Sequence, residues 1–217
     1  MRTIGVIGCY SHDVILLLAK AVRCLGERVI VRDRNDARIL SACIPLSEEN
    51  NREGYTEYHG IYFSAGEGKT GTDDGTGVEF VDFGLSPRPQ ECGLCKELIV
   101  ICDMHMHHMR WIRDAVFPRE NVKLCILRDV VPGLLSREKT VTDFLTGLNA
   151  ERQIYLLPDD RDIKNRYVCE LQHAYSLKNA SDGMREAIFE TVCLLFPDTE
   201  EKELRRKLRQ EERREYR

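Results

Sequence analysis

The chain has little that would carry it into a membrane or onto nucleic acid. Its longest apolar run, at residues 14–19, is six residues long, whereas a membrane-spanning helix needs about 20. Lysine and arginine number 32 against 36 aspartates and glutamates, for a formal charge of −4. The basic excess that is typical of nucleic-acid binding is therefore missing. We expect no membrane span and no nucleic-acid partner.

The sequence also lacks the signs of a disulfide framework and of a secretion signal. Its nine cysteines are scattered along the chain, and their odd number favours reduced thiols. The opening residues, MRTIGVIGC, are typical of a buried strand and not of a signal peptide. We therefore expect a cytoplasmic protein.

A phosphate-binding loop is missing where its signature comes closest. The stretch SAGEGKTG at residues 64–71 contains Gly-Lys-Thr, but a P-loop requires G-x-x-x-x-G-K-[ST] between a strand and a helix. The first glycine of that pattern would stand at position 63, which is Phe63, and the strand-like VEFVDFG follows without a helix. We interpret this stretch as a turn-rich excursion between two strands.

What is present is an alternation of strand and helix patterns. Hydrophobic residues make up 42% of the chain and charged residues 31%, as in a globular domain. The alternation predicts an α/β, Rossmann-like three-layer fold with a mainly parallel sheet flanked by helices. We expect one domain over residues 1–197. Residues 198–217 are nearly all charged and predict a solvated helical tail, with a docking element for a partner as the alternative.

The first strand-to-helix turn is the usual anion site of such a sheet, because the helix begins there with unpaired N–H groups. In this chain the turn is IGCYSHDVI, which offers Gly8 and Ser11, and no lysine or arginine lies between Thr3 and Ala19. Bulky side chains stand where a phosphate loop would have small ones, at Tyr10 and His12.

Two readings of His12 and Asp13 remain open. They could form a modified anion or proton-transfer site, in which Asp13 opposes any positive charge on His12. Alternatively, they form an ordinary helix cap with a solvated side chain.

The order of elements resembles that of the ParA/MinD-like group of SIMIBI-class P-loop ATPases. The opening, RTIGVIGCYSHDVILLLAKAVRCLGERVIVRD, matches the family pattern at Leu18, Ala19 and Gly26. The segment VEFVDFG resembles its Walker B strand, with Asp82 and Gly84 at the matching positions. The resemblance covers residues 2–197 and implies a P-loop NTPase fold.

Later segments extend this resemblance. IYLLPDDRDI resembles the strand and proline loop that border the adenine, which places Pro158 there, and SDGMREAIFETVCLLF resembles the final helix. The family usually carries an asparagine after the strand NVKLCIL, where this chain has Arg128 or Asp129. Carried over residue by residue, the resemblance implies a nucleotide site at Gly8, Ser11, Asp82, Gly84 and Pro158.

The departure from the family decides the functional expectation. ParA/MinD ATPases carry K-G-G-x-G-K-[ST], and this chain has neither lysine in its shorter first loop. The lysine and the neighbouring hydroxyl hold the phosphates and Mg²⁺. We expect a degenerate Walker A and a pseudo-ATPase, with at most weak ATP or ADP binding. The family implies a non-hydrolysing scaffold or localisation factor in pole placement, partitioning or pilus and secretion assembly, with a protein partner and a homodimer.

The alternative is a metal-dependent enzyme with a rebuilt site at the carboxyl ends of the strands. Asp13 and Asp82 are its candidate catalytic residues. The segment DMHMHHM offers Asp103, His105 and His108 as ligands for a divalent metal such as Zn²⁺. The competing interpretation is a polar turn that leads into a helix.

A lone CGLC motif supplies Cys92 and Cys95. Structural zinc needs a second pair of ligands, so we interpret these residues as incidental thiols, with a redox or zinc role as the alternative. Cys9, Cys102 and Cys125 lie in or beside apolar strands, where cysteine behaves as a small hydrophobe.

Overall fold

Eight strands of the described chain form one sheet, in the order β3-β4-β2-β5-β1-β6-β7-β8. A computed structural model describes residues 1–45, 55–65, 76–85, 89–116, 121–135 and 137–215. The strands are β1 (Arg2–Gly8), β2 (Val29–Asp33), β3 (Thr56–Tyr58), β4 (Ile61–Ala65), β5 (Val78–Asp82), β6 (Glu97–Cys102), β7 (Val122–Leu127) and β8 (Arg152–Tyr155). Every pairing is parallel except β3 with β4, which is antiparallel. The predicted mainly parallel sheet is confirmed.

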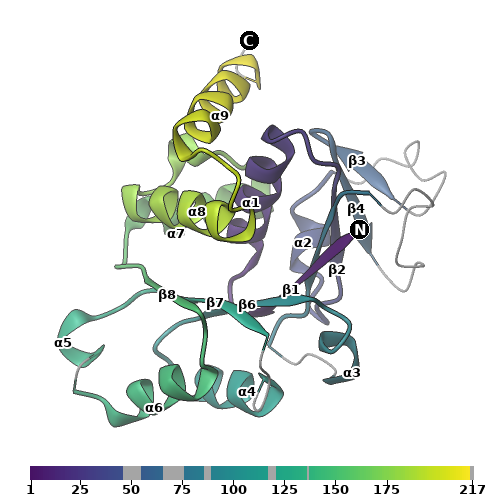
Figure 1. Ribbon diagram of the computed structural model, residues 1–217. Helices are drawn as coiled ribbons and strands as arrows, with labels where there is room; N and C mark the ends of the chain where they lie inside the picture. The colour runs from purple at the N-terminus through teal and green to yellow at the C-terminus, as the bar shows by residue number, and fades with distance from the viewer. Residues whose placement is uncertain (46–54, 66–75, 86–88, 117–120, 136, 216–217) are drawn as a thin grey trace.

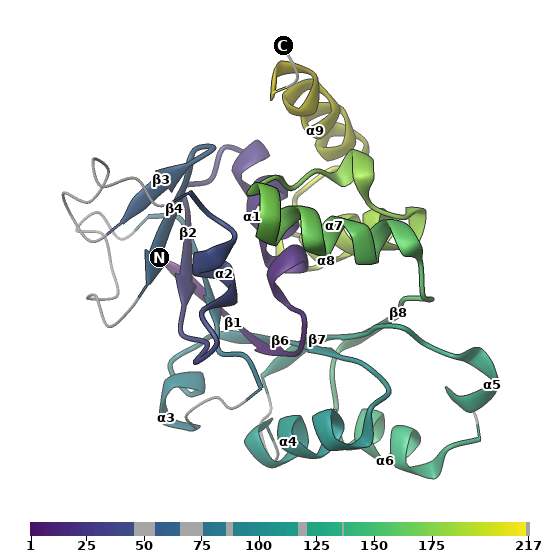
Figure 2. The same ribbon diagram turned by 180° about the vertical axis from the view of Figure 1, so that it is seen from behind.

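Helices cover both faces of this sheet and give three layers (Figure 1). The helices are α1 (His12–Cys24), α2 (Ile39–Ala42), α3 (Pro89–Cys92), α4 (Met106–Val116), α5 (Pro132–Leu135), α6 (Lys139–Leu148), α7 (Asp160–Gln172), α8 (Asp182–Leu195) and α9 (Glu201–Glu215), with a 3₁₀ turn η2 at Leu177–Asn179. Figure 2 shows α1, α7 and α8 on one side of the sheet and α4 and α6 on the other.

The alternation of side chains along β1 explains why one strand supplies both cores. Ile4 and Val6 join the core that contains α1, α8 and α9, whereas Ile7 joins the core that contains α4 and α6. Successive side chains of a strand point to opposite faces. A central strand therefore has to be apolar on both faces, as the sequence of β1 is.

The glycine-rich stretch lies almost entirely outside the described residues. Only Ser64 and Ala65 of SAGEGKTG are described, at the end of β4. The strands that precede and follow it, β4 and β5, lie on either side of β2 and are parallel to it.

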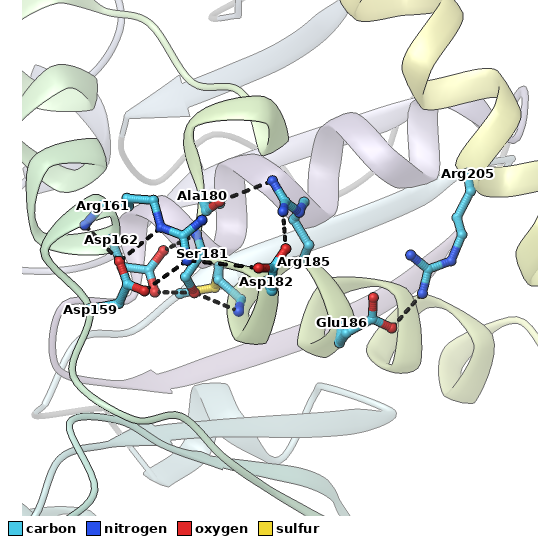
Figure 3. A network of polar contacts seen from close by, with 10 residues as sticks. Asp159, Arg161, Asp162, Ala180, Ser181, Asp182, Arg185, Glu186 and Arg205 are labelled. Atoms are coloured by element: carbon cyan, nitrogen blue, oxygen red, sulfur yellow. Dashed lines mark hydrogen bonds and ion pairs between the residues drawn. The ribbon is translucent and has the colours of Figure 1, made fainter.

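Helix α7 begins within the segment that was predicted as a strand and proline loop, residues 154–163, and continues through residues for which the sequence analysis predicted no element. Asp159 caps the helix, since its side chain accepts a hydrogen bond from the Arg161 N–H at 2.8 Å. Figure 3 shows how α7 is joined to α8: Ser181 donates through Oγ to Asp162 at 2.6 Å and caps α8 at Met184 N. These contacts hold the two helices together at their N-terminal ends.

The charged C-terminal segment forms a helix that is not solvated all round. Leu204 and Leu208 of α9 are 0% and 2% exposed and belong to the core with α1 and α8. Arg205 also pairs with Glu186 of α8, as Figure 3 shows. The predicted boundary at residues 197 and 198 stays a prediction. Among the described residues, no helix combines the length and the apolar character that crossing a membrane requires.

Candidate functional site

The carboxyl ends of β1 and β6 lie side by side at a point where the chain leaves the sheet in opposite directions. β1 and β6 are parallel neighbours. Helix α1 follows β1 onto one face, and α4 follows β6 onto the other (Figure 1). In open α/β sheets, the crevice outside the strand ends at such a switch point is the usual ligand site. The first residues after the two strands are Cys9 and Asp103.

Gly8 is required by the tight approach of β1 to β6. Its φ is 156°, and a Cβ at this position would lie 1.8 Å from the carbonyl oxygen of Ile101. The following N–H, of Cys9, donates to that same oxygen at 3.1 Å, and Gly8 N–H donates to Gly84 O at 2.8 Å. Backbone crowding therefore accounts for this glycine without a bound phosphate.

A buried ion pair stands at the start of α1. Arg128, just beyond the end of β7, donates through its two terminal nitrogens to the two carboxylate oxygens of Asp13, at 2.7 and 2.8 Å. It also donates to the backbone oxygen of Tyr10 at 2.5 Å. The side chains of Arg128 and Asp13 are 3% and 1% exposed. The first turn has no cation of its own in the sequence, but Arg128 reaches it from the end of β7. This arginine is bound to the carboxylate of Asp13.

The pKa shifts of this pair favour the charged form of both partners. Burial acts to raise the pKa of Asp13, but the charge and hydrogen bonds of Arg128 outweigh it and hold the pKa below its usual value. Burial likewise opposes the charge of Arg128, and Asp13 outweighs it and raises the pKa of Arg128. Each charge is therefore compensated by the other.

The first turn is also covered from the side of α7. Tyr10 adopts a left-handed backbone conformation with φ 50°, and the guanidinium of Arg166 lies 5.0 Å from the centre of its ring. His12 is 1% exposed, so the reading of His12 as a solvated side chain is wrong. Its Nε2 lies 3.2 Å from Oε1 of Glu170 on α7. Burial lowers the pKa of His12, which disfavours an imidazolium that could attract a phosphate.

Ser11 and Asp82, both predicted site residues, are in direct contact. Ser11 Oγ donates to Asp82 Oδ1 at 3.0 Å, and the N–H of Gly84 donates to the same oxygen at 3.1 Å. Asn35 lies 3.4 Å from the other carboxylate oxygen. Burial raises the pKa of Asp82 to about 6, against the opposing effect of these hydrogen bonds. The structure thus brings Ser11, Asp82 and Gly84 together beside the first turn.

The three predicted metal ligands lie in contact, but the two histidines differ in their exposure to solvent. His108 Nδ1 lies 2.8 and 2.9 Å from the two oxygens of Asp103. His105 Nδ1 lies 3.0 Å from Asp103 Oδ2, but its side chain is 68% exposed. The His105 N–H also donates to Asp103 Oδ1 at 2.9 Å, which is the polar turn before a helix that the sequence left open as the alternative.

A thiol that the sequence analysis missed completes this group. Potential ligand atoms of Cys9, Asp103 and His108 all lie within 4.8 Å of one another. Cys9 had been interpreted as a small hydrophobe, and it is indeed 6% exposed. Its position directly after a central strand, like that of Asp103, was the signal that could have linked the two residues.

The remaining sequence candidates lie apart from these groups or inside the core. Pro158 is exposed in the segment between β8 and α7, and no contact described for it reaches the first turn. Cys92 and Cys95 of the CGLC motif are 0% and 5% exposed and belong to the core with α4 and α6.

Comparison with known proteins identifies the fold. No protein-family model matches the chain, and no curated protein matches it in sequence. A chain of the MinC:MinD cell division protein complex of Aquifex aeolicus is similar with a TM-score of 0.63 and 12% identity, over 92% of this chain and 98% of that one. A ParA family ATPase from Chlorobium tepidum TLS is similar with a TM-score of 0.53 and 13% identity, over 90% and 99%. The protein therefore has a ParA/MinD-like, Rossmann-like α/β fold, as the sequence predicted.

Proposed function

We propose that this protein is a non-hydrolysing member of the ParA/MinD-like fold, a pseudo-ATPase that acts as a protein-binding scaffold or localisation factor. The observation that carries the proposal is the Asp13–Arg128 pair at the start of α1. A nucleotide hydrolase needs uncompensated cations there, because charge develops on the transferring phosphoryl group. Here Arg128, which reaches the turn from the end of β7, is held by the Asp13 carboxylate on two hydrogen bonds.

Releasing Arg128 to a phosphate would be costly. It would leave Asp13 as an uncompensated charge in a fully buried position, and breaking such a pair costs about 3–5 kcal/mol. The carboxylate would also repel the incoming phosphate at the same helix terminus. In this proposal the first loop fails to bind phosphate for two reasons. It lacks the Walker A lysines, and the arginine beside it, Arg128, is already bound to Asp13.

The Ser11–Asp82 contact is the part of a nucleotide site that this chain retains. In P-loop ATPases a loop hydroxyl and a strand-terminal aspartate hold Mg²⁺, and Ser11 and Asp82 are bonded to each other at 3.0 Å. Retention of the metal side without the phosphate side supports weak ATP or ADP binding at most, with Pro158 at the adenine side.

An exposed apolar stripe supports a protein partner. Ile163, Tyr167 and Leu171 are 38%, 60% and 77% exposed, and their spacing of four residues places them on one face of α7. Exposed apolar patches of this kind are typical of interaction surfaces. One of the similar structures is that of the MinC:MinD complex, an assembly of two proteins. By analogy we propose that this chain acts as a homodimer in pole placement, partitioning or pilus and secretion assembly.

The proposal is tested by the response of the purified chain to nucleotide. We expect ATP or ADP with Mg²⁺ to leave both the mass measured by light scattering and the melting temperature nearly unchanged, because Arg128 at the first turn is already bound to Asp13. Asp82→Ala serves as the control for specific binding. A nucleotide-driven change of oligomeric state that Asp82→Ala abolishes would contradict the proposal.

A further inference from the structure

The switch point between β1 and β6 brings three different metal-ligating groups together from separate parts of the chain. Cys9 follows β1, Asp103 follows β6, and His108 lies in the first turns of α4. Their ligand atoms lie within 4.8 Å of one another. None of these residues takes part in the Asp13–Arg128 pair or the Ser11–Asp82 contact, so the cluster is independent of the nucleotide question.

We propose that Cys9, Asp103 and His108 bind one zinc ion or a similar divalent transition metal, with a fourth coordination position open to water or to an outside ligand. Thiolate, imidazole and carboxylate are the ligand types that zinc takes in proteins, and three protein ligands with one open position are a common arrangement. Ligand atoms around a tetrahedral zinc ion are about 3.5 Å apart. Since all the ligand atoms lie within 4.8 Å of one another, none has to approach another by more than about 1.3 Å. His108 Nδ1 and Asp103 Oδ1, now 2.8 Å apart, would separate slightly to admit the ion.

Burial of the cluster favours a specific site over casual binding at the surface. The side chains of Asp103 and His108 are 4% and 14% exposed, and Cys9 is 6% exposed. His105, which also contacts Asp103, is 68% exposed and marks the side from which an ion can enter. Buried ligands lose little entropy when they bind, because their side chains are already held in place.

The polar turn before α4 explains only part of the arrangement. A cap requires the bond from the His105 N–H to Asp103 Oδ1, at 2.9 Å. The cap does not require His108 Nδ1 to lie within hydrogen-bond distance of both Asp103 oxygens. It also does not require Cys9 to lie close to them. These two features are what a three-ligand site needs.

Charge in the cluster suits a cation. Asp103 brings a carboxylate to the cluster, and a metal ion can replace the protons shared with His108 and carried by Cys9. Binding of Zn²⁺ forms the S–Zn bond and releases the Cys9 proton to solvent, with no change of oxidation state.

The test uses the full chain, freed of metal with a chelator and then titrated with Zn²⁺ alone or Co²⁺ alone. We expect one zinc ion per chain and, with cobalt, a sulfur-to-cobalt charge-transfer band. Loss of an outer hydrogen-bond partner weakens metal sites by about 10–100-fold. Cys9→Ser, which removes a ligand, should therefore weaken zinc binding at least about 100-fold and abolish the cobalt band.

A matched variant acts as the control. Cys43→Ser changes another buried cysteine, in the core that contains α1. It should bind zinc within about threefold of the unchanged chain, well inside the loss expected for a ligand. Equal affinity in Cys9→Ser would overturn the proposal. If Cys9→Ser fails to fold, the unchanged chain decides: a cobalt complex without the sulfur band refutes the site.

Discussion

The Asp13–Arg128 pair and the Cys9–Asp103–His108 cluster lie on either side of the β1–β6 switch point and use ionisable residues in opposite ways. In the pair, both carboxylate oxygens of Asp13 are bonded to a permanent cation. In the cluster, the Asp103 carboxylate faces an imidazole and a thiol, whose protons a metal can displace. An arginine cannot be displaced in this way, because it stays protonated. The type of partner therefore decides which carboxylate is available for a ligand.

The largest predicted loss of stability comes from breaking the Asp13–Arg128 pair. Arg128→Ala leaves Asp13 charged and buried, and should lower the free energy of unfolding by about 3–5 kcal/mol. The double variant Asp13→Leu with Arg128→Met replaces both charges with apolar groups and should recover most of the loss. Urea unfolding of the three chains measures both effects.

The exposed pair of Arg161 with Asp159 provides the control for this prediction. Arg161→Ala should leave the unfolding midpoint unchanged, because a solvated ion pair contributes little. If Arg128→Ala left the unfolding midpoint as unchanged as Arg161→Ala does, Asp13 would not depend on Arg128 to compensate its buried charge.

A second effect concerns Asp82, next to the first turn. Its folded pKa of about 6 lies above the ordinary 3.8, so the folded state holds the proton more tightly than the unfolded state does. This group therefore adds stability as the pH falls from about 7 to about 4. Asp82→Asn keeps an oxygen acceptor for Ser11 and removes the buried charge. It should be more stable than the unchanged chain at pH 7.5, by up to about 3 kcal/mol.

That advantage should shrink steadily as the pH approaches 4.5, where the unchanged chain carries a protonated Asp82. Denaturant unfolding of both chains over this pH range is the measurement. A stability difference that stays constant with pH would show that Asp82 is not the group that titrates.

A third effect tests whether the Cys9–Asp103–His108 cluster accepts a cation. Zinc at about 100 times its dissociation constant should stabilise the chain by about 2.7 kcal/mol, which raises the melting temperature by roughly 5–10 °C. Asp103→Asn keeps an oxygen for the His105 N–H and so preserves the helix cap, but it removes the carboxylate. It should lose most of the zinc response. An undiminished response in Asp103→Asn would assign the zinc effect to other residues.

The smallest predicted effect concerns the cover over the first turn. Tyr10→Ala removes the ring that lies 5.0 Å from the Arg166 guanidinium. Cation–π contacts at exposed sites contribute about 0.5–1 kcal/mol, so stability should fall by that amount at most. A loss as large as that of Arg128→Ala would mean that Tyr10 and the Asp13–Arg128 pair form one coupled unit.

The fold could be predicted from the sequence because its main signals are local. Apolar β-branched runs such as RTIGVIG and VEFVD indicated the strands, and the spacing of apolar residues indicated helices such as α8. Helix α7 was missed because only its first residues belong to the segment that resembled a proline loop, and no element was predicted for the rest. Strand β3, at Thr56–Tyr58, was missed because it is short and polar.

The site was harder to predict because its contacts join residues that are distant in sequence. Asp13 and Arg128 are 115 positions apart, and nothing near either residue indicates the other. The absence of a cation in the first turn was therefore read correctly from the sequence, but the arginine that fills the space was not. The family resemblance assigned Ser11 and Asp82 to one nucleotide site but did not predict that they contact each other. Cys9, directly after an apolar strand, was interpreted as a small hydrophobe. The roles of Gly8, Ser11, Asp82, Gly84 and Pro158 toward a nucleotide stay predictions.

The most direct test of the central claim is the steady-state hydrolysis of ATP by the purified full chain with Mg²⁺. The Asp13–Arg128 pair predicts phosphate release that is indistinguishable between the unchanged chain and its Asp82→Ala variant. Sustained phosphate release that Asp82→Ala abolishes would contradict the claim, since it would mean that the first turn receives and stabilises a triphosphate.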